Sequence, residues 1–239
     1  MTATTEFAPG EPIRPLLRRQ ILTDDVYVQL NSRIMNGSIA PEARINIEDT
    51  ARRLDVSPTP VREALARLDS DSLVVKLPLK GYRTTALLGE AEVRELYELR
   101  LLLEPYSARQ AALNITKAAA TALRAEMATC PVAPTASRHE DYQSLTSHDS
   151  RLHELILTIA GNDMITNAFA RTHCHLHIFR LSYEGPLGER TLHEHGKVVD
   201  AVIAGDPNAA EAAMREHLET SRGHMLAHVA RIAAEQDQH

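Results

Sequence analysis

The sequence predicts a mainly α-helical protein in two parts: three short helices with a β-hairpin, then an antiparallel all-helical bundle of about six helices. Three observations lead to this fold class. Hydrophobic residues make up 44% of the 239 residues, which is ample material for a core. Aromatic residues make up only 4%, and Trp is absent, whereas strands favour aromatic and β-branched side chains. Apolar residues also recur at helical spacing along most of the chain, and strand character is confined to a stretch near residue 80.

The N-terminal part divides into short elements. Residues 1–15 carry three prolines and a glycine without an apolar period, so we expect a flexible arm. A helix is expected over about 22–36, and Asn46 is suited to cap a second helix. A third helix is expected to begin with Thr59 as its cap and Pro60 in its first turn. The segment LVVKLPLKGYRTTAL that follows predicts two short strands joined by a turn.

From Gly89 onward the apolar spacing is helical throughout. Loop signals and glycines divide this part into about six helices. Among them, the segment DMITNAFARTHCHLHIFRLSY is expected to form a single helix.

Charge and histidine content separate the two parts. Residues 1–85 carry 12 Lys and Arg against 11 Asp and Glu, whereas the remainder carries 14 against 21, and all twelve histidines lie at or beyond His139. We therefore expect an arm over 1–15, an N-terminal domain over 16–86 and a chemically different helical domain over 87–239. Two cysteines and no apolar run of the ~20 residues needed to span a bilayer favour a cytoplasmic protein without a membrane partner.

Three short helices followed by a hairpin predict a winged helix-turn-helix. The third helix keeps one face apolar and carries polar and cationic residues elsewhere, as a recognition helix requires. Basic residues on the hairpin would lie along the phosphate backbone. The candidate DNA-binding residues are Arg52, Thr59, Arg62, Arg67, Lys80 and Gly81. The alternative for each arginine is an ordinary solvated helix face.

Acidic and histidine residues in the second part are spaced as metal ligands. Asp149 and His153 lie four residues apart and share a helix face. His195 lies on a later helix, and His217 follows on a separate antiparallel one. One carboxylate and three imidazoles suit a borderline divalent metal, with zinc expected first and nickel, manganese or iron as alternatives. Such spacing also arises by chance, and a lone histidine is more often a surface or core residue.

The segments DVSPTPVREALARLDSDSLV and GYRTT resemble the DNA-binding domain of the GntR superfamily over about residues 22–85. The resemblance implies a transcription regulator that binds double-stranded DNA. Two positions depart from the family pattern: Pro58 stands where many members carry arginine, and Glu48 occupies a position that is basic in some. Base contacts would then fall to Thr59, Arg62 and the hairpin.

The segments HDSRLHELILTIAGN, EHGKVVDAVIAGD and AMREHL resemble the FCD effector domain of the FadR subfamily over about 89–235. In its metal-binding members the ligand positions map onto Asp149, His153, His195 and His217, and a small carboxylic acid binds beside the metal. Arg100 matches an arginine that can pair with the acid, the alternative being an ion pair with Glu104. Within HCHLH, His175 is a candidate contact to the effector.

These features favour a homodimeric, ligand-responsive regulator that binds a pseudo-palindromic operator and is not an enzyme. One alternative is a metal-dependent enzyme acting on a small organic acid, although Glu194, the nearest general-base candidate, should point off the ligand face. Another is a metalloregulator for which the metal itself is the signal.

Overall fold

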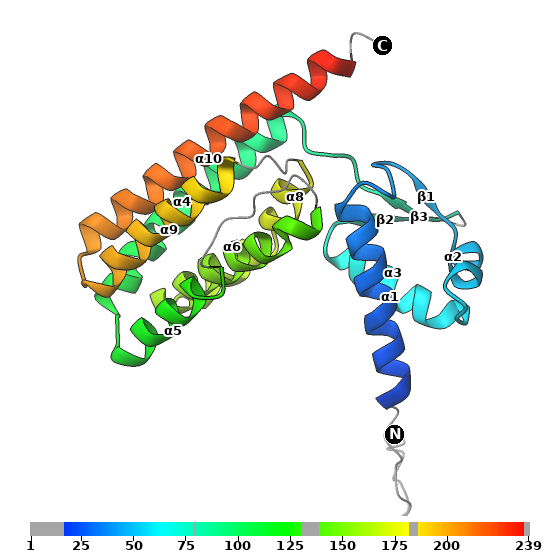
Figure 1. Ribbon diagram of the computed structural model, residues 1–239, viewed down its shortest axis with the longest axis horizontal. Helices are drawn as coiled ribbons and strands as arrows, with labels where there is room; N and C mark the ends of the chain where they lie inside the picture. The colour runs from blue at the N-terminus through cyan, green and yellow to red at the C-terminus, as the bar shows by residue number, and fades with distance from the viewer. Residues whose placement is uncertain (1–16, 79, 131–138, 182–185, 237–239) are drawn as a thin grey trace, which may run out of the picture.

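The computed structural model of the chain describes residues 17–236 apart from 79, 131–138 and 182–185. The arm predicted over 1–15 lies outside the described residues. As predicted, the fold is mainly helical, with a small N-terminal unit that contains a sheet and a C-terminal unit made of helices (Figure 1).

The N-terminal unit is a winged helix-turn-helix. Its elements are α1 (Leu17–Met35), β1 (Arg44–Ile45), α2 (Ile47–Arg53), α3 (Pro58–Ser70), β2 (Val74–Leu77) and β3 (Gly81–Thr84). The strands form an antiparallel sheet in the order β1-β3-β2. Apolar side chains from the helices and from the inner face of the sheet make one core, among them Val26, Leu30, Ala51, Leu65, Leu68 and Tyr82.

Two local features of this unit differ from the sequence-based expectation. The sheet has a third strand, β1, which at two residues is too short to give an alternating pattern. The recognition helix α3 begins at Pro58, with Ser57 as its N-cap, so Thr59 lies in the first turn instead of capping the helix. Proline is tolerated at this start because the first N–H groups of a helix have no acceptor within it. The Asn46 cap of α2 is confirmed, because its side chain accepts from the backbone N–H of Asp49 at 3.0 Å.

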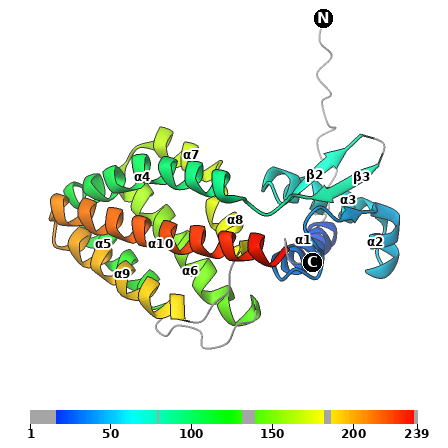
Figure 2. The same ribbon diagram turned by 90° about the horizontal axis from the view of Figure 1, so that it is seen from above.

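The C-terminal unit contains seven helices among the described residues, against about six expected. They are α4 (Glu90–Leu113), α5 (Lys117–Met127), α6 (His139–Ala160), α7 (Asp163–Ala170), α8 (Cys174–Leu181), α9 (Pro186–Ile203) and α10 (Pro207–Gln236). The long helices α4 and α10 run antiparallel along each other, and α6 and α9 pack against them (Figures 1 and 2). Apolar residues of these helices form a continuous core.

The extra helix arises from a break within the segment expected to form a single helix. Helix α7 ends at Ala170, and His173 adopts a left-handed backbone conformation with φ 45° before α8 begins. Histidine is one of the few residues besides glycine that enter this region with some frequency. No Gly or Pro stands at the break, so the sequence carried no loop signal there.

None of the helices in the described part of the chain combines the length and apolar composition that crossing a membrane requires.

Candidate metal centre and DNA-binding surface

The structure brings the four candidate metal ligands together inside the helical unit. Asp149 and His153 lie on α6, His195 on α9 and His217 on α10, and all four are buried. One ligand atom from each residue lies within 4.8 Å of the others. Residues separated by up to 68 positions in the sequence therefore meet at one point.

The hydrophobic periodicity of the helices explains this convergence. On α9, Val198, Val199 and Val202 follow His195 at i+3, i+4 and i+7, and all three are in the core. On α6, Ile156 follows His153 at i+3 and is also in the core. Because residues at these spacings share a helix face, burying the apolar stripe also turns the ligand side chains inward.

The outer nitrogen of His153 is held by a buried ion pair on α4. Its Nδ1 hydrogen-bonds the Glu104 carboxylate, whose other oxygen accepts from Arg100 Nε at 2.6 Å. All three side chains are almost fully buried. Burial disfavours the charged form of Glu104, but Arg100 and His153 outweigh it and hold the pKa of Glu104 well below its ordinary value. An ionised carboxylate only accepts, so Nδ1 of His153 carries the proton.

A chain of hydrogen bonds fixes His195 in the same way. Its Nδ1 lies 3.2 Å from Nε2 of His148, whose Nδ1 lies 3.1 Å from Oε1 of Glu126. Arg151 binds both oxygens of Glu126 at 3.0 Å, and this contact, against the opposing effect of burial, lowers the pKa of Glu126. Glu126 thus accepts from His148 Nδ1, His148 Nε2 is left as an acceptor, and His195 Nδ1 donates to it.

The third imidazole completes the pattern. Nδ1 of His217 lies 2.9 Å from Oε2 of Glu194 on α9. Glu194 does point off the ligand face of its own helix, as expected, and so it reaches the outer side of a ligand on α10. With Nδ1 protonated, each of the three histidines presents a bare Nε2 to the cluster, which is the form that ligates metals.

The inner side of the cluster holds imidazole nitrogens that face Asp149 without a protein hydrogen bond in the described part of the chain. Nε2 of His153 and Nε2 of His195 are buried and have no hydrogen-bond partner among the described residues. Burial, which outweighs the attraction of Asp149, lowers the pKa of His195 to about 3 and so keeps it neutral. The neighbouring imidazoles His175, His195 and His153 overcome the opposing effect of burial and hold the pKa of Asp149 well below its usual range. An ionised carboxylate and buried imidazole nitrogens that converge on it fit a divalent metal ion.

His175 lies at the edge of this cluster. It projects from α8, and its Nε2 is 3.1 Å from Oδ2 of Asp149. Its ring centroid is 5.1 Å from that of His153, close to the 5.4 Å between His153 and His195. Arg100, by contrast, makes the ion pair with Glu104 that was the alternative to an effector contact, so its direct contact with an effector stays a prediction. The adjacent Cys174 is buried, which raises the pKa of its thiol to about 11.

The sequence-based interpretation did not assign four residues that orient the ligands: Glu104, Glu126, His148 and Glu194. Each comes from a helix, or a face of a helix, other than that of the imidazole it supports. A partial signal was present, since His148 directly precedes Asp149 and Glu104 follows Arg100 by one helical turn.

The candidate DNA-binding residues lie on α2, α3 and the hairpin. Arg62 of α3 is exposed and pairs with Glu48 of α2 at 3.1 Å, so the acidic departure noted in the sequence directly engages a recognition-helix arginine. Arg52 is exposed and pairs with Asp49 at 2.7 Å. Exposed pairs of this kind contribute little stability and are readily exchanged for phosphate contacts.

Two of the other candidates, Arg67 and Gly81, also have structural roles. Arg67 is directed toward α1, where it pairs with Asp24 and lies 4.2 Å from the ring centroid of Tyr27. Lys80 is exposed in the turn that precedes β3. Gly81 has φ +83°, and a Cβ there would lie 2.8 Å from the carbonyl oxygen of Ile45. Glycine is therefore required at 81 by the close approach of β1, whatever contact the turn makes with DNA.

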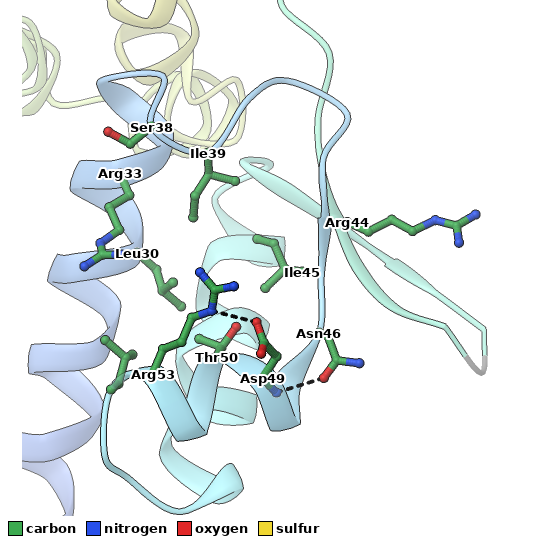
Figure 3. Close-up of a pocket in the computed structure, with 11 residues that line it drawn as sticks. Leu30, Arg33, Ser38, Ile39, Arg44, Ile45, Asn46, Asp49, Thr50 and Arg53 are labelled. Carbon is green, nitrogen blue, oxygen red and sulfur yellow. Dashed lines mark hydrogen bonds and ion pairs between the residues drawn. The ribbon is translucent and has the colours of Figure 1, made fainter.

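A pocket of about 290 Å³ opens between α1, β1 and α2 (Figure 3). Two of its polar side chains, Asp49 and Arg53, pair at 2.8 Å, and Asn46 caps α2. Arg44 extends from β1 away from the pocket, onto the outer side of the sheet (Figure 3). The pocket is separate from the Asp/His cluster, which lies in the helical unit.

A winged helix-turn-helix joined to a helical unit with a buried Asp/His cluster is typical of DNA-binding regulators. Comparison with known families agrees. Residues 22–83 match the bacterial regulatory proteins of the gntR family, and residues 95–220 match the FCD domain. The chain belongs to the gntR family of bacterial regulators that carry a C-terminal FCD domain.

Curated relatives are transcription regulators and not enzymes. The chain is 27% identical to the HTH-type transcriptional repressor RspR of Escherichia coli K12, over 92% of this chain and 91% of the relative. It is 26% identical to the HTH-type transcriptional regulator YdhC of Bacillus subtilis 168, over 84% of this chain and 85% of the relative. In structure it resembles a GntR regulator from Rhodococcus sp. RHA1, with a TM-score of 0.65 and 23% identity over 86% of this chain and 97% of the other. It also resembles Escherichia coli McbR/YncC, with a TM-score of 0.63 and 21% identity over 85% of this chain and 96% of the other. These two likenesses support the fold.

Proposed function

We propose that this regulator binds a divalent metal through Asp149, His153, His195 and His217, and that a small carboxylic acid bound beside the metal alters its affinity for DNA. The observation that carries the proposal is the convergence of buried imidazole Nε2 atoms, oriented from behind by Glu104, His148 and Glu194, on an ionised carboxylate. Such oriented second partners are characteristic of metal-binding histidines. Zinc is the first candidate, and nickel, manganese and iron suit the same donors.

The acid effector would occupy ligand positions that four protein donors leave open on a six-coordinate ion. His175, whose Nε2 lies 3.1 Å from Oδ2 of Asp149, stands beside that position. Arg100 supplies positive charge behind the cluster, although its guanidinium is held by Glu104. A bound carboxylate would therefore meet a metal, an imidazole and a positive field in one buried place.

On the DNA side, we propose a DNA-binding domain over 16–86, a helical domain over 87–239 and a homodimer that binds a pseudo-palindromic operator. Arg62, Arg52 and Lys80 are exposed and available to phosphates or bases. Thr59, in the first turn of α3, is suited to a contact where the recognition helix enters the major groove.

Metal analysis of purified variants tests the ligand assignment. We expect the wild-type protein to retain one metal ion per chain in elemental analysis and native mass spectrometry, and H195A and H217A to lose it. H193A is the matched control, because His193 lies on the same helix but is exposed. Retention of the metal by both H195A and H217A would show that the ligand assignment is wrong.

A metalloregulator is the alternative that the same donors favour. DNA affinity would then follow metal concentration in the absence of any acid. Titrating an organic acid at constant saturating zinc separates the two, because only the effector mechanism gives a further change in affinity.

A further inference from the structure

Helix α8 lies between the metal-binding cluster and the DNA-binding unit. Its residues Cys174, Ile178 and Leu181 belong to a core cluster of the helical unit. Leu176 and Phe179, on another face, pack against the core of the winged helix-turn-helix. The end of the bundle that carries α8 adjoins α1 in both views (Figures 1 and 2). One short helix is thus part of both units.

The N-terminal end of α8 contacts a candidate metal ligand. His175 is buried, and its Nε2 lies 3.1 Å from Oδ2 of Asp149, while Oδ1 of the same carboxylate lies 3.2 Å from Nε2 of His195. The two oxygens of Asp149 therefore face different partners. Any change in the orientation of this carboxylate changes its contact with α8.

The C-terminal end of α8 contacts the segment that joins the two units. Arg180 is buried and donates to the side-chain oxygen of Thr85 at 2.8 Å and to its backbone oxygen at 3.0 Å. Thr85 directly follows β3, and its backbone N–H bonds the carbonyl of Leu73, next to β2. The guanidinium of Arg180 thus connects α8 with the base of the hairpin.

The geometry points to α8 as the element that couples the cluster to the DNA-binding unit, with His175 as a positioning residue at one end and Arg180 at the other. This inference depends on the proposed metal site. Helix α8 has only eight residues, so we expect a displacement at His175 to reach Arg180 at its other end. The left-handed residue His173 separates α8 from α7, so the two helices differ in direction.

Hydrogen exchange of the full-length protein, with zinc or with a chelator, tests the coupling. In the wild type we expect zinc to change protection of the backbone over residues 81–89, far from the ligands in sequence. R180M removes the hydrogen bonds to Thr85 but leaves the cluster intact, so zinc should still bind while the change over 81–89 is lost. R171M is the matched control, because Arg171 is exposed just before α8.

His175 requires its own pair of variants. H175L removes the nitrogen near Asp149 and should reduce the zinc-dependent change, whereas H175Q, which keeps an N–H group at a similar reach, should restore part of it. A purely structural role would affect both variants alike. Affinity for a duplex selected from a random pool gives a second readout. In the wild type we expect the affinities with and without zinc to differ by about 5–150-fold, as is typical of coupled sites. In R180M the ratio of these two affinities should approach 1.

The outcomes separate the two proposals. A wild-type protein that binds no metal overturns the proposed function and the coupling with it. A wild-type protein that binds zinc without any change over 81–89, or an R180M variant that binds zinc and keeps the change, overturns the coupling alone.

Discussion

The tautomer of each candidate ligand is set by a residue outside the cluster. Glu104, His148 and Glu194 each hold the Nδ1 of one histidine, and each comes from a different helical position. At the scale of single residues, the metal site therefore depends on two carboxylates and one imidazole that would not touch the metal. This dependence makes their removal informative.

Substitution of Glu194 should weaken metal binding without removing a ligand. We expect E194A to lower zinc affinity by about 10–100-fold, because His217 loses the acceptor that orients its ring. Competition with a chromophoric chelator measures the change. E189A, an exposed carboxylate on the same helix, should leave the affinity unchanged, and equal losses in the two variants would indicate a general charge effect.

Gly81 and Gly223 should respond to alanine in opposite ways. G81A should lower the stability of the DNA-binding unit by about 1–3 kcal/mol, because φ is +83° and the new Cβ would meet the carbonyl of Ile45. G223A lies in α10 with no atom within 4 Å of the new Cβ and should stabilise its helix by up to about 1 kcal/mol. Native-state hydrogen exchange measures each unit separately. Unchanged protection in G81A would contradict the packing argument.

At the scale of elements, the wing sheet carries two arginines directly opposite each other. Arg44 of β1 pairs in register with Arg83 of β3, and both side chains are exposed on the outer face. Glu42 lies 3.8 Å from Arg83. Like charges placed opposite each other disfavour the sheet, so the pair is better explained by an anionic partner such as a phosphate backbone.

Removal of Arg44 should weaken DNA binding uniformly across sequences. We expect R44A to reduce affinity for a random-sequence duplex and to reduce the slope of log affinity against log salt by about 0.9, the value for one phosphate contact. Fluorescence anisotropy at several salt concentrations measures both. R94A removes an exposed arginine from the helical unit and should keep the wild-type slope. An unaltered slope in R44A would place this arginine outside the DNA contact.

At the scale of the whole molecule, the cluster joins three helices that also share one apolar core. Its ligands come from α6, α9 and α10, so a bound ion would cross-link the bundle at its centre. The same bundle adjoins the DNA-binding unit through α8. Metal occupancy is therefore expected to affect stability as well as DNA binding.

Zinc should stabilise the protein by mass action. At a free concentration of 100 times its Kd, we expect a gain of about 2.7 kcal/mol in the free energy of unfolding, because the unfolded chain lacks the assembled site. Thermal unfolding with zinc and with a chelator measures the difference. Magnesium, which prefers an octahedron of oxygen donors, should give no comparable shift, and H217A should lose the effect. Equal stabilisation by both metals would argue against the Asp/His site.

Most of the fold could be predicted because its signals are local. The recognition helix, the hairpin and the long helices each follow from apolar spacing and caps within a few residues, and Asn46 shows this directly. Strand β1 and the break at His173 could not be predicted. Strand β1 is too short to show a period, and the break has no Gly or Pro to mark it in the sequence. The four ligand positions could be proposed because each lies in a short segment that resembles the FCD domain.

The sequence by itself determined the order and type of the main elements, the family and a set of four residues that could hold a metal. Only the tertiary structure decided that these residues meet, that Arg100 is committed to Glu104 and that His175 faces Asp149. It also decided the supporting chain from His195 through His148 to Glu126. The physical reason is the range of each interaction. Periodicity and capping act within a few turns of one helix, whereas hydrogen bonds between helices depend on the rotation and axial offset that each helix adopts in the packed core.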